Sequence, residues 1–171
     1  MPVDVPRVYL HDGAGRRIGQ FSTAYNVDRA YLIMEPASAR FMITTDDPLA
    51  DEIDPRQGRY VVIDSDAYPY PWVGKLTQPN WTRASETITI ICRSADAILT
   101  QRFINGTYSG AAGAVFTQLV NDAAALNATG IGVASTGVAP GDAYAATFND
   151  RPAFQCLTTL AREVGYEWWV E

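Results

Sequence analysis

The stretch Glu86-Thr87-Ile88-Thr89-Ile90-Ile91-Cys92 shows the clearest alternation of apolar and polar residues in the chain. Successive side chains of a β-strand point to opposite faces of the sheet, so this alternation predicts a strand with one face against a core. The residues expected to face that core are Ile88, Ile90 and Cys92.

The sequence before this stretch also has the character of short strands. Asp12-Gly13-Ala14-Gly15 is a strong turn signal between two apolar segments, which predicts a hairpin from Val8 to Phe21. Further strands are expected at 40–45, 59–64 and 72–77, with turns at Asp46-Asp47-Pro48 and Asp54–Gly58. Short strands at this spacing are typical of a small β-barrel or sandwich. We assign it to residues 1–104.

The pattern changes to a helical period after a loop expected at 105–110. One helix is predicted from Ala111 to about Asn127, with Ser109 as its N-cap. A second is predicted to open at Asn149-Asp150-Arg151-Pro152 and to end at Gly165. Residues 105–171 are therefore expected to form a compact two-helix α/β module, and the fold class is α+β.

The last six residues, Tyr166-Glu167-Trp168-Trp169-Val170-Glu171, are expected to form a terminal strand. Adjacent tryptophans in a strand point to opposite faces, and both indoles need to be covered. A terminal strand also needs a neighbour for its backbone groups. We predict a partner interface here; burial within the chain itself is the alternative. Its residues are Tyr166, Trp168, Trp169 and Val170.

Composition limits the possible functions. The chain has 171 residues, 47% hydrophobic and 19% charged, which is ordinary for a folded globular protein. Its net charge is −6 and Lys75 is its single lysine, which argues against binding to a phosphate backbone but not against lining a passage for nucleic acid. No secretory signal or membrane span is expected. Cys92 and Cys156 are predicted to be buried free thiols.

No pattern in the sequence predicts a catalytic, metal or cofactor site. His11 is the single histidine, so a zinc site or a catalytic triad would depend on it alone. The glycine-rich stretch Gly106–Gly113 lacks the Lys-Ser/Thr ending of a phosphate-binding loop. An acidic cluster lacks the ligand order of a calcium-binding loop and is interpreted as a capped turn and short helix. Its members are Asp46, Asp47, Asp51, Glu52 and Asp54.

An aromatic group near a proline-rich turn supports an alternative function. Aromatic side chains on one face of a β-domain can stack on sugar rings, which favours a carbohydrate- or receptor-binding module. The competing interpretation places Trp72 in the core and the tyrosines over a hairpin edge. The group consists of Tyr68, Tyr70, Trp72 and Trp81.

Several segments, taken in order, carry a resemblance to a known family. A polar loop leads into a strand that ends at a D-D-P turn, and further strands and the second helix follow. The segments are Ser38–Ala50, Gly58–Val61, Val73–Leu76, Thr87–Cys92 running into Ser94–Arg102, and Leu160–Gly165. In this order they resemble the N-terminal half of a phage tail-hub (baseplate hub) protein.

The resemblance implies a structural protein without catalysis. It implies a β-barrel module followed by a small α/β module, in a ring of usually three subunits that joins the tail tube to the tail tip around the DNA channel. The implied location is the virion tail, assembled in the host cytoplasm. The implied partners are the tail tube, a tip or spike protein, or a second hub chain. Hub proteins continue where this chain stops at Glu171, so either another polypeptide supplies that half or the chain is a minimal hub.

Overall fold

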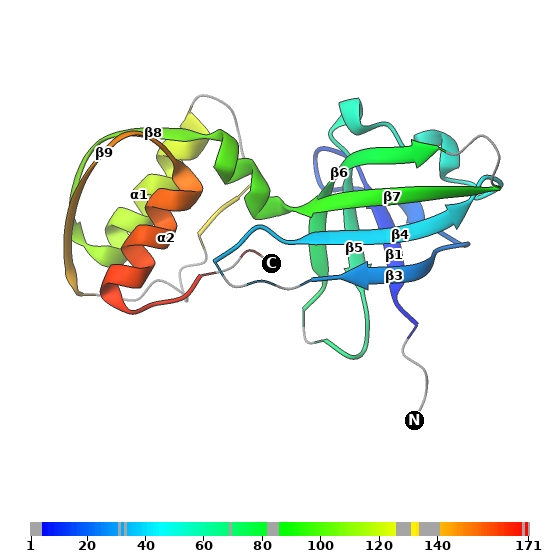
Figure 1. The fold of residues 1–171 in the computed structure, drawn as a ribbon, viewed down its shortest axis with the longest axis horizontal. Coiled ribbons are helices and arrows are strands. Elements are labelled where there is room, and N and C mark those ends of the chain that lie inside the picture. Colours follow the sequence, from blue (N-terminus) through cyan, green and yellow to red (C-terminus); the bar gives the residue numbers. More distant parts are fainter. Residues whose placement is uncertain are drawn as a thin grey trace. The chain divides into compact units, whose positions relative to one another are not determined.

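The chain folds into two compact units. The structure is a computed structural model that describes residues 5–30, 32, 34–68, 70–81, 86–125, 131–133, 141–168 and 170, and of residues 78–81 it describes the backbone alone. Met1–Leu32 and Pro36–Ala95 form the first unit, and Ile33–Glu35 with Asp96–Val170 form the second (Figure 1). The division after Ala95 precedes the boundary expected at 104/105, because Leu99 and Ile104 are buried in the core of the second unit.

The first unit is built on a seven-stranded sheet. Every pair of neighbouring strands is antiparallel, and the order is β2-β1-β5-β6-β7-β4-β3. The strands are β1 (Arg7–His11), β2 (Arg17–Gln20), β3 (Tyr25–Arg29), β4 (Ser38–Thr44), β5 (Tyr60–Asp64), β6 (Trp72–Trp81) and β7 (Thr87–Ser94). The predicted hairpin and the strand at 86–92 are confirmed as β1–β2 and β7.

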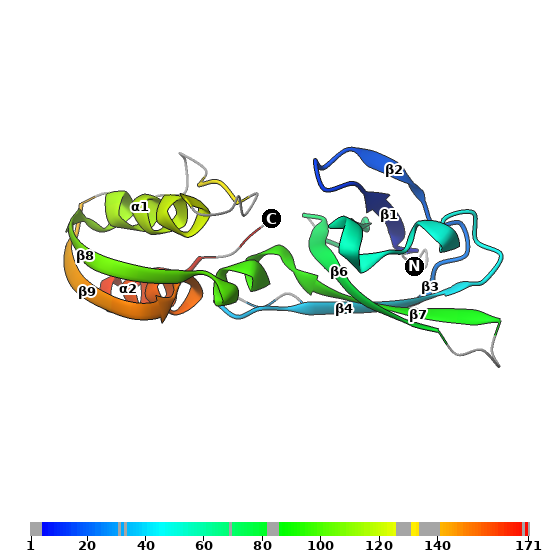
Figure 2. The same cartoon turned by 90° about the horizontal axis from the view of Figure 1, so that it is seen from above.

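The sheet folds over onto itself around one core. In Figures 1 and 2, β3, β4 and β7 run across one side of the first unit, and β1 and β5 cross behind them. The core between them includes Leu10, Phe41, Ile63, Ile88 and Ile90. Among the described residues, no pairing joins the outer strands β2 and β3, so the expected closure into a barrel is not confirmed.

Trp72 and Gly74 fix the geometry of β6. The Trp72 side chain is 3% exposed, and its indole N–H donates to the carbonyl oxygen of Ala30 at 3.0 Å. A Cβ atom at Gly74 would lie 2.1 Å from Cη2 of Trp72 and 2.6 Å from the carbonyl oxygen of Arg93. No side chain fits there, so glycine at position 74 allows the indole to enter the core.

In the described part of the chain, two 3-10 helices lie between β4 and β5, and a third follows β7. They are η1 (Ala50–Glu52), η2 (Pro55–Gln57) and η3 (Ala95–Gln101). The turn predicted at Asp54–Gly58 is confirmed, because the Asp54 side chain accepts a hydrogen bond from the Arg56 backbone N–H and Gly58 ends η2 in the left-handed conformation.

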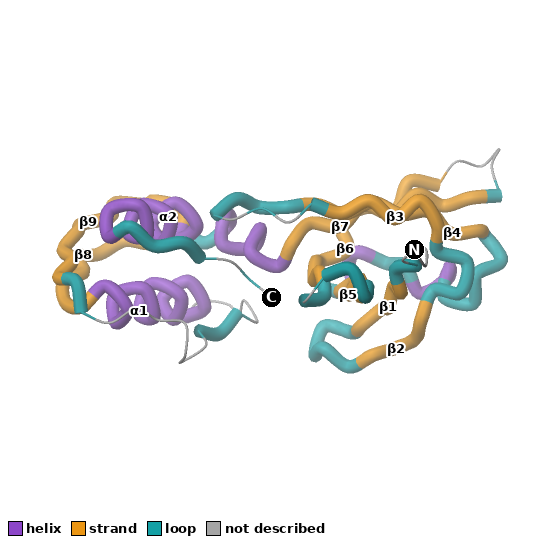
Figure 3. The backbone as a smooth tube through the Cα atoms, turned by 90° about the horizontal axis from the view of Figure 1, so that it is seen from below, coloured by secondary structure: helices purple, strands orange, loops and turns teal. Residues whose placement is uncertain are grey.

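The second unit packs two helices against a two-stranded ribbon. Strands β8 (Phe103–Ala111) and β9 (Ala143–Pro152) are antiparallel, and the ribbon curves along helices α1 (Ala112–Ala125) and α2 (Ala153–Val164) (Figures 1 and 3). Helix α1 contacts β8 and α2, and α2 contacts β9. The side chains that the ribbon contributes to the core are Ile104, Tyr108, Tyr144 and Phe148.

The boundaries of this unit differ from the prediction. The loop expected at 105–110 is the middle of β8, so Ser109 lies in a strand and is not an N-cap. The residues expected to open the second helix, Asn149–Pro152, are the end of β9. Helix α2 begins at Ala153 and ends, as predicted, at Gly165, which adopts the left-handed conformation with φ of 75°.

Two further predictions concern the burial of the two cysteine thiols and a membrane-spanning segment. Both cysteines are free and buried, as predicted: Cys92 lies in the first core and Cys156 in the second. Burial raises the pKa of the Cys156 thiol to about 11. No helix in the described part of the chain combines the length and apolar character needed to cross a membrane.

Candidate functional site

The C-terminal segment does not form the predicted strand. After α2, the backbone N–H of Tyr166 donates to the carbonyl oxygen of Ala161 at 2.8 Å, and that of Gly165 donates to Arg162. This pair of bonds is a Schellman motif, which turns the chain at the end of a helix. Tyr166, Trp168 and Val170 lie outside any strand; Trp169 and Glu171 lie outside the described residues.

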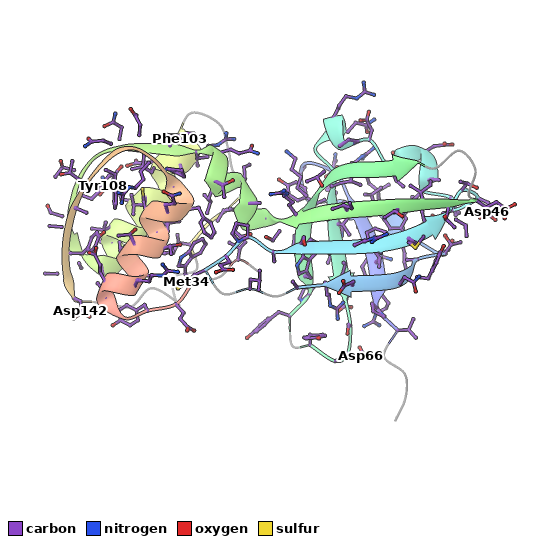
Figure 4. The ribbon with its side chains drawn as sticks, viewed as in Figure 1. Met34, Asp46, Asp66, Phe103, Tyr108 and Asp142 are labelled. Carbon is purple, nitrogen blue, oxygen red and sulfur yellow. The ribbon has the colours of Figure 1, made fainter. Side chains whose placement is uncertain are left out.

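The indole of Trp168 is buried in its own unit. It is 7% exposed, with its ring centre 5.0 Å from that of Phe154 and 6.1 Å from that of Phe116. The backbone carbonyl oxygen of Trp168 accepts a hydrogen bond from the backbone N–H of Met34. Met34, which is labelled in Figure 4, has a positive φ of 57°. Burying the indole against two rings removes more apolar surface from water than an open strand would.

The other predicted interface residues differ in their exposure. Tyr166 is 41% exposed, and Val170 is half-buried against the core that holds Trp168. The segment therefore presents Tyr166 to solvent and directs Trp168 inward. A partner contact at this segment stays a prediction, and among the described residues of the segment Tyr166 offers an accessible aromatic side chain for it.

In the acidic cluster, the Asp47 carboxylate accepts hydrogen bonds from nearby backbone and hydroxyl groups. Asp47 is 4% exposed and accepts hydrogen bonds from the backbone N–H groups of Thr23 (2.9 Å) and Leu49 (3.0 Å) and from the hydroxyls of Thr23 and Ser22. Burial by itself raises the pKa of Asp47, but these hydrogen bonds outweigh it and the pKa is lowered.

The rest of the cluster is paired or dispersed. Glu52 forms an ion pair with Arg59, and hydrogen bonds from Arg56 hold the pKa of Asp54 below its usual range. Asp46 lies exposed at the end of β4 (Figure 4). Among the described residues, no three His, Cys, Asp or Glu side chains are grouped as metal ligands would be. His11 lies in β1, and its Nδ1 is 2.9 Å from the carbonyl oxygen of Gly15.

The aromatic group does not form one platform. The Trp72 side chain is in the core, whereas Tyr68 and Tyr70 are 49% and 54% exposed. The Arg29 guanidinium lies over the Tyr68 ring at 4.7 Å from its centre. The side chain of Trp81 lies outside the described residues. The burial of Trp72 confirms the competing interpretation, which placed its side chain in the core, so a sugar-stacking surface cannot include this indole.

The structure brings together three cations that the sequence pattern did not single out. In the strand register, Lys75 of β6 lies directly opposite Arg93 of β7. Arg40 of β4 lies opposite Ile91, two residues before Arg93, so it shares the same sheet face. Arg40 and Arg93 are exposed and Lys75 is half-buried. A basic patch thus lies on the outer face of the first unit.

Solved structures with the same fold identify the class of protein that the chain resembles. No protein-family model and no curated protein sequence matches this chain. The tail protein from Neisseria meningitidis MC58 superposes with a TM-score of 0.56 and 15% identity, over 97% of this chain and 48% of that protein. The chain has the fold of a tail protein.

A second solved structure supports this assignment of the fold. The 43 kDa tail protein of prophage MuSo2 from Shewanella oneidensis gives a TM-score of 0.55 and 18% identity, over 94% of this chain and 49% of that protein. The chain therefore spans about half the length of each of these tail proteins. Both units take part in the likeness, since nearly the whole chain is covered.

Proposed function

We propose that this chain is a structural, non-enzymatic protein of a phage tail, which forms a ring-shaped hub or adaptor between the tail tube and the tail tip around the DNA channel. The observation that carries the proposal is the fold that it shares with two tail proteins over more than nine-tenths of its length. A trimer in the virion tail, assembled in the host cytoplasm, is part of the proposal.

Unpaired strand edges support a role in assembly. Among the described residues, β2 and β3 at the ends of the large sheet, and β8 and β9 in the ribbon, each pair on one side only. From Gly106 to Ala111 and from Ala143 to Phe148, the ribbon has no charged residue and no proline. Those are the residues with which proteins commonly protect an exposed edge, so these edges can accept a strand of a neighbour.

The partners we propose are other tail proteins: the tail tube, a tip or spike protein, or a second hub chain that corresponds to the remaining half of the solved tail proteins. At the C-terminal segment we propose Tyr166 as a contact, because its aromatic side chain is 41% exposed. Tyr166→Glu should weaken assembly while leaving the thermal unfolding of the chain unchanged.

The proposal is tested by native mass spectrometry and negative-stain electron microscopy of the chain, purified alone and together with the tail proteins of its own phage. Ring-shaped particles with a central opening and a fixed copy number are expected. A chain that remains monomeric at all accessible concentrations and copurifies with no tail protein would overturn the proposal. Binding to a glycan array that depends on Tyr68 or Tyr70 would instead favour the receptor-binding alternative.

A further inference from the structure

The outer face of the large sheet combines exposed apolar side chains with three cations that form no ion pair among the described residues. We call this surface the β4–β7 face; its residues are Arg40, Met42, Lys75, Ile91 and Arg93. Antiparallel partners directly opposite one another share a sheet face, and so do residues two positions along a strand. The register places Lys75 opposite Arg93 and Arg40 opposite Ile91, which brings the three cations together on three adjacent strands.

These cations lack partners among the described residues. Four other arginines of the first unit form ion pairs: Arg7 with Asp64 and Asp66, Arg16 with Asp12, Arg56 with Asp54, and Arg59 with Glu52. In the described part of the chain, no carboxylate lies within ion-pair distance of Arg40, Lys75 or Arg93, although Asp28 is opposite Arg40 in the β3–β4 register. Like charges directly opposite in a sheet are unfavourable, so the isolated chain gains nothing from the Lys75–Arg93 arrangement.

The apolar part of the face indicates a protein partner. Ile91 is 41% exposed between the cations, and Met42 lies on the neighbouring strand opposite the 36% exposed Tyr25. An exposed aliphatic centre with arginines beside it has the composition of a protein–protein interface. Three cations in a chain of net charge −6 are few for a phosphate backbone, whose binding commonly takes six to ten contacts.

The second unit supplies the opposite charge. It contains seven acidic residues and three arginines, and six of the acidic side chains are exposed. They are Glu35, Asp122, Asp142, Asp150, Glu163 and Glu167. The acidic excess of the chain is thus concentrated in the second unit. A second copy of this chain therefore carries a surface of complementary charge.

We propose that the β4–β7 face binds the acidic second unit of another copy of this chain, an inference that rests on the proposed assembly of copies into a ring. Such a contact joins two different surfaces of the same protein, and repeating it with a closing rotation generates a ring. The carboxylates of the neighbour convert the Lys75–Arg93 repulsion into ion pairs, and the neighbour covers Ile91.

The test compares two charge-matched double variants of the full chain. Lys75→Glu/Arg93→Glu alters the face, and Arg16→Glu/Arg56→Glu makes the same charge change at two exposed, locally paired turns. Self-association is measured by sedimentation equilibrium between about 0.05 M and about 0.5 M salt, where screening of charges increases strongly. Circular dichroism establishes that each variant is folded, and single Lys75→Glu replaces the double variant if the latter does not fold.

The proposal expects the face variant to associate roughly tenfold or more weakly than the wild type, with the control variant within about twofold. Higher salt should weaken the wild type more than the face variant. Equal effects of the two variants, or no self-association of the wild type, would overturn the inference. If the face variant still forms rings like those of the wild type, the proposed function survives and this interface does not.

Binding of short duplex DNA, measured by fluorescence anisotropy, tests the other class of anionic partner. The wild type and the face variant are expected to bind DNA equally weakly. If the wild type binds DNA, the face variant loses that binding and self-association is unchanged, the face contacts nucleic acid and the proposal is overturned.

Discussion

Replacing Trp168 with alanine should destabilise the second unit, because its indole is part of that unit's core. The side chain is 7% exposed and lies against Phe154 and Phe116. A buried aromatic side chain removes about 150–250 Å² from water, which at about 25 cal/mol per Å² contributes about 4–6 kcal/mol. Alanine retains a small part of this and the cavity relaxes in part, so Trp168→Ala should cost about 3–5 kcal/mol.

The assay is urea denaturation followed by far-ultraviolet circular dichroism, because both α-helices belong to the second unit. Tyr166→Ala is the matched control two residues away; its side chain is 41% exposed, and the expected change is at most about 0.5–1 kcal/mol. Trp168→Phe should cost far less than Trp168→Ala, because a ring is retained and the indole N–H has no partner among the described residues.

A free energy of unfolding that falls by less than about 1 kcal/mol in Trp168→Ala would refute this reasoning. If association were lost at the same time, the indole would belong to a partner interface, as the sequence alone suggested. The comparison thus decides between the core and the interface for the same residue.

Three more predictions concern the first unit. Gly74→Ala should cost about 3 kcal/mol or more in a thermal melt, because its methyl group would overlap the Trp72 ring. Asp47→Asn should cost about 1–3 kcal/mol at neutral pH, because an amide N–H₂ would face hydrogen-bond donors. The folded-state pKa of Asp47 is lowered, so its contribution to stability is present above the unfolded pKa of about 3.9 and is lost as pH falls through the folded value. The free energy of unfolding of Asp47→Asn should therefore fall less than that of the wild type between neutral and acidic pH. Lys75→Glu should raise the stability of the dilute, unassociated chain by about 0.2–1 kcal/mol, because glutamate would face Arg93; a lower melting temperature would contradict it.

The strands of the first unit were predictable where alternation was strong. Strands β4, β5 and β7 carry apolar residues at every second position, and each was expected within one or two residues of its observed bounds. Strand β3 was missed, because Tyr25–Arg29 is polar and its register is interrupted between Tyr25 and Asp28. A bulge removes the period of two that a sequence pattern depends on.

The ribbon was missed for a different physical reason. In β8 the fully buried side chains are Ile104 and Tyr108, with Gly106 between them on the same face. In β9 they are Tyr144 and Phe148, with Ala146 between them. Because the middle position of each strand is a small residue, the large apolar residues stand four apart. Such a pattern shows no alternation and imitates a helical period.

The candidate interfaces show what a sequence leaves open. A segment with two tryptophans and a valine favours a strand, but the hydrogen bonds that follow Gly165 direct it back onto α2. The β4–β7 face could not be found from spacing, because it depends on the register between β4, β6 and β7. No local pattern relates Lys75 to Arg93, which are far apart in the chain.

The charge distribution explains how an acidic chain could associate with copies of itself. A net charge of −6 opposes association at long range, but at physiological salt this repulsion is screened beyond about 8 Å. Contacts within that distance then decide the outcome, and there the position of each cation matters more than the total charge. The chain pairs several of its arginines at turns and sets three cations side by side on one sheet face. An anionic surface that covers the like-charge pair would compensate its repulsion, so we expect the residues that lower the stability of the monomer to favour the proposed assembly.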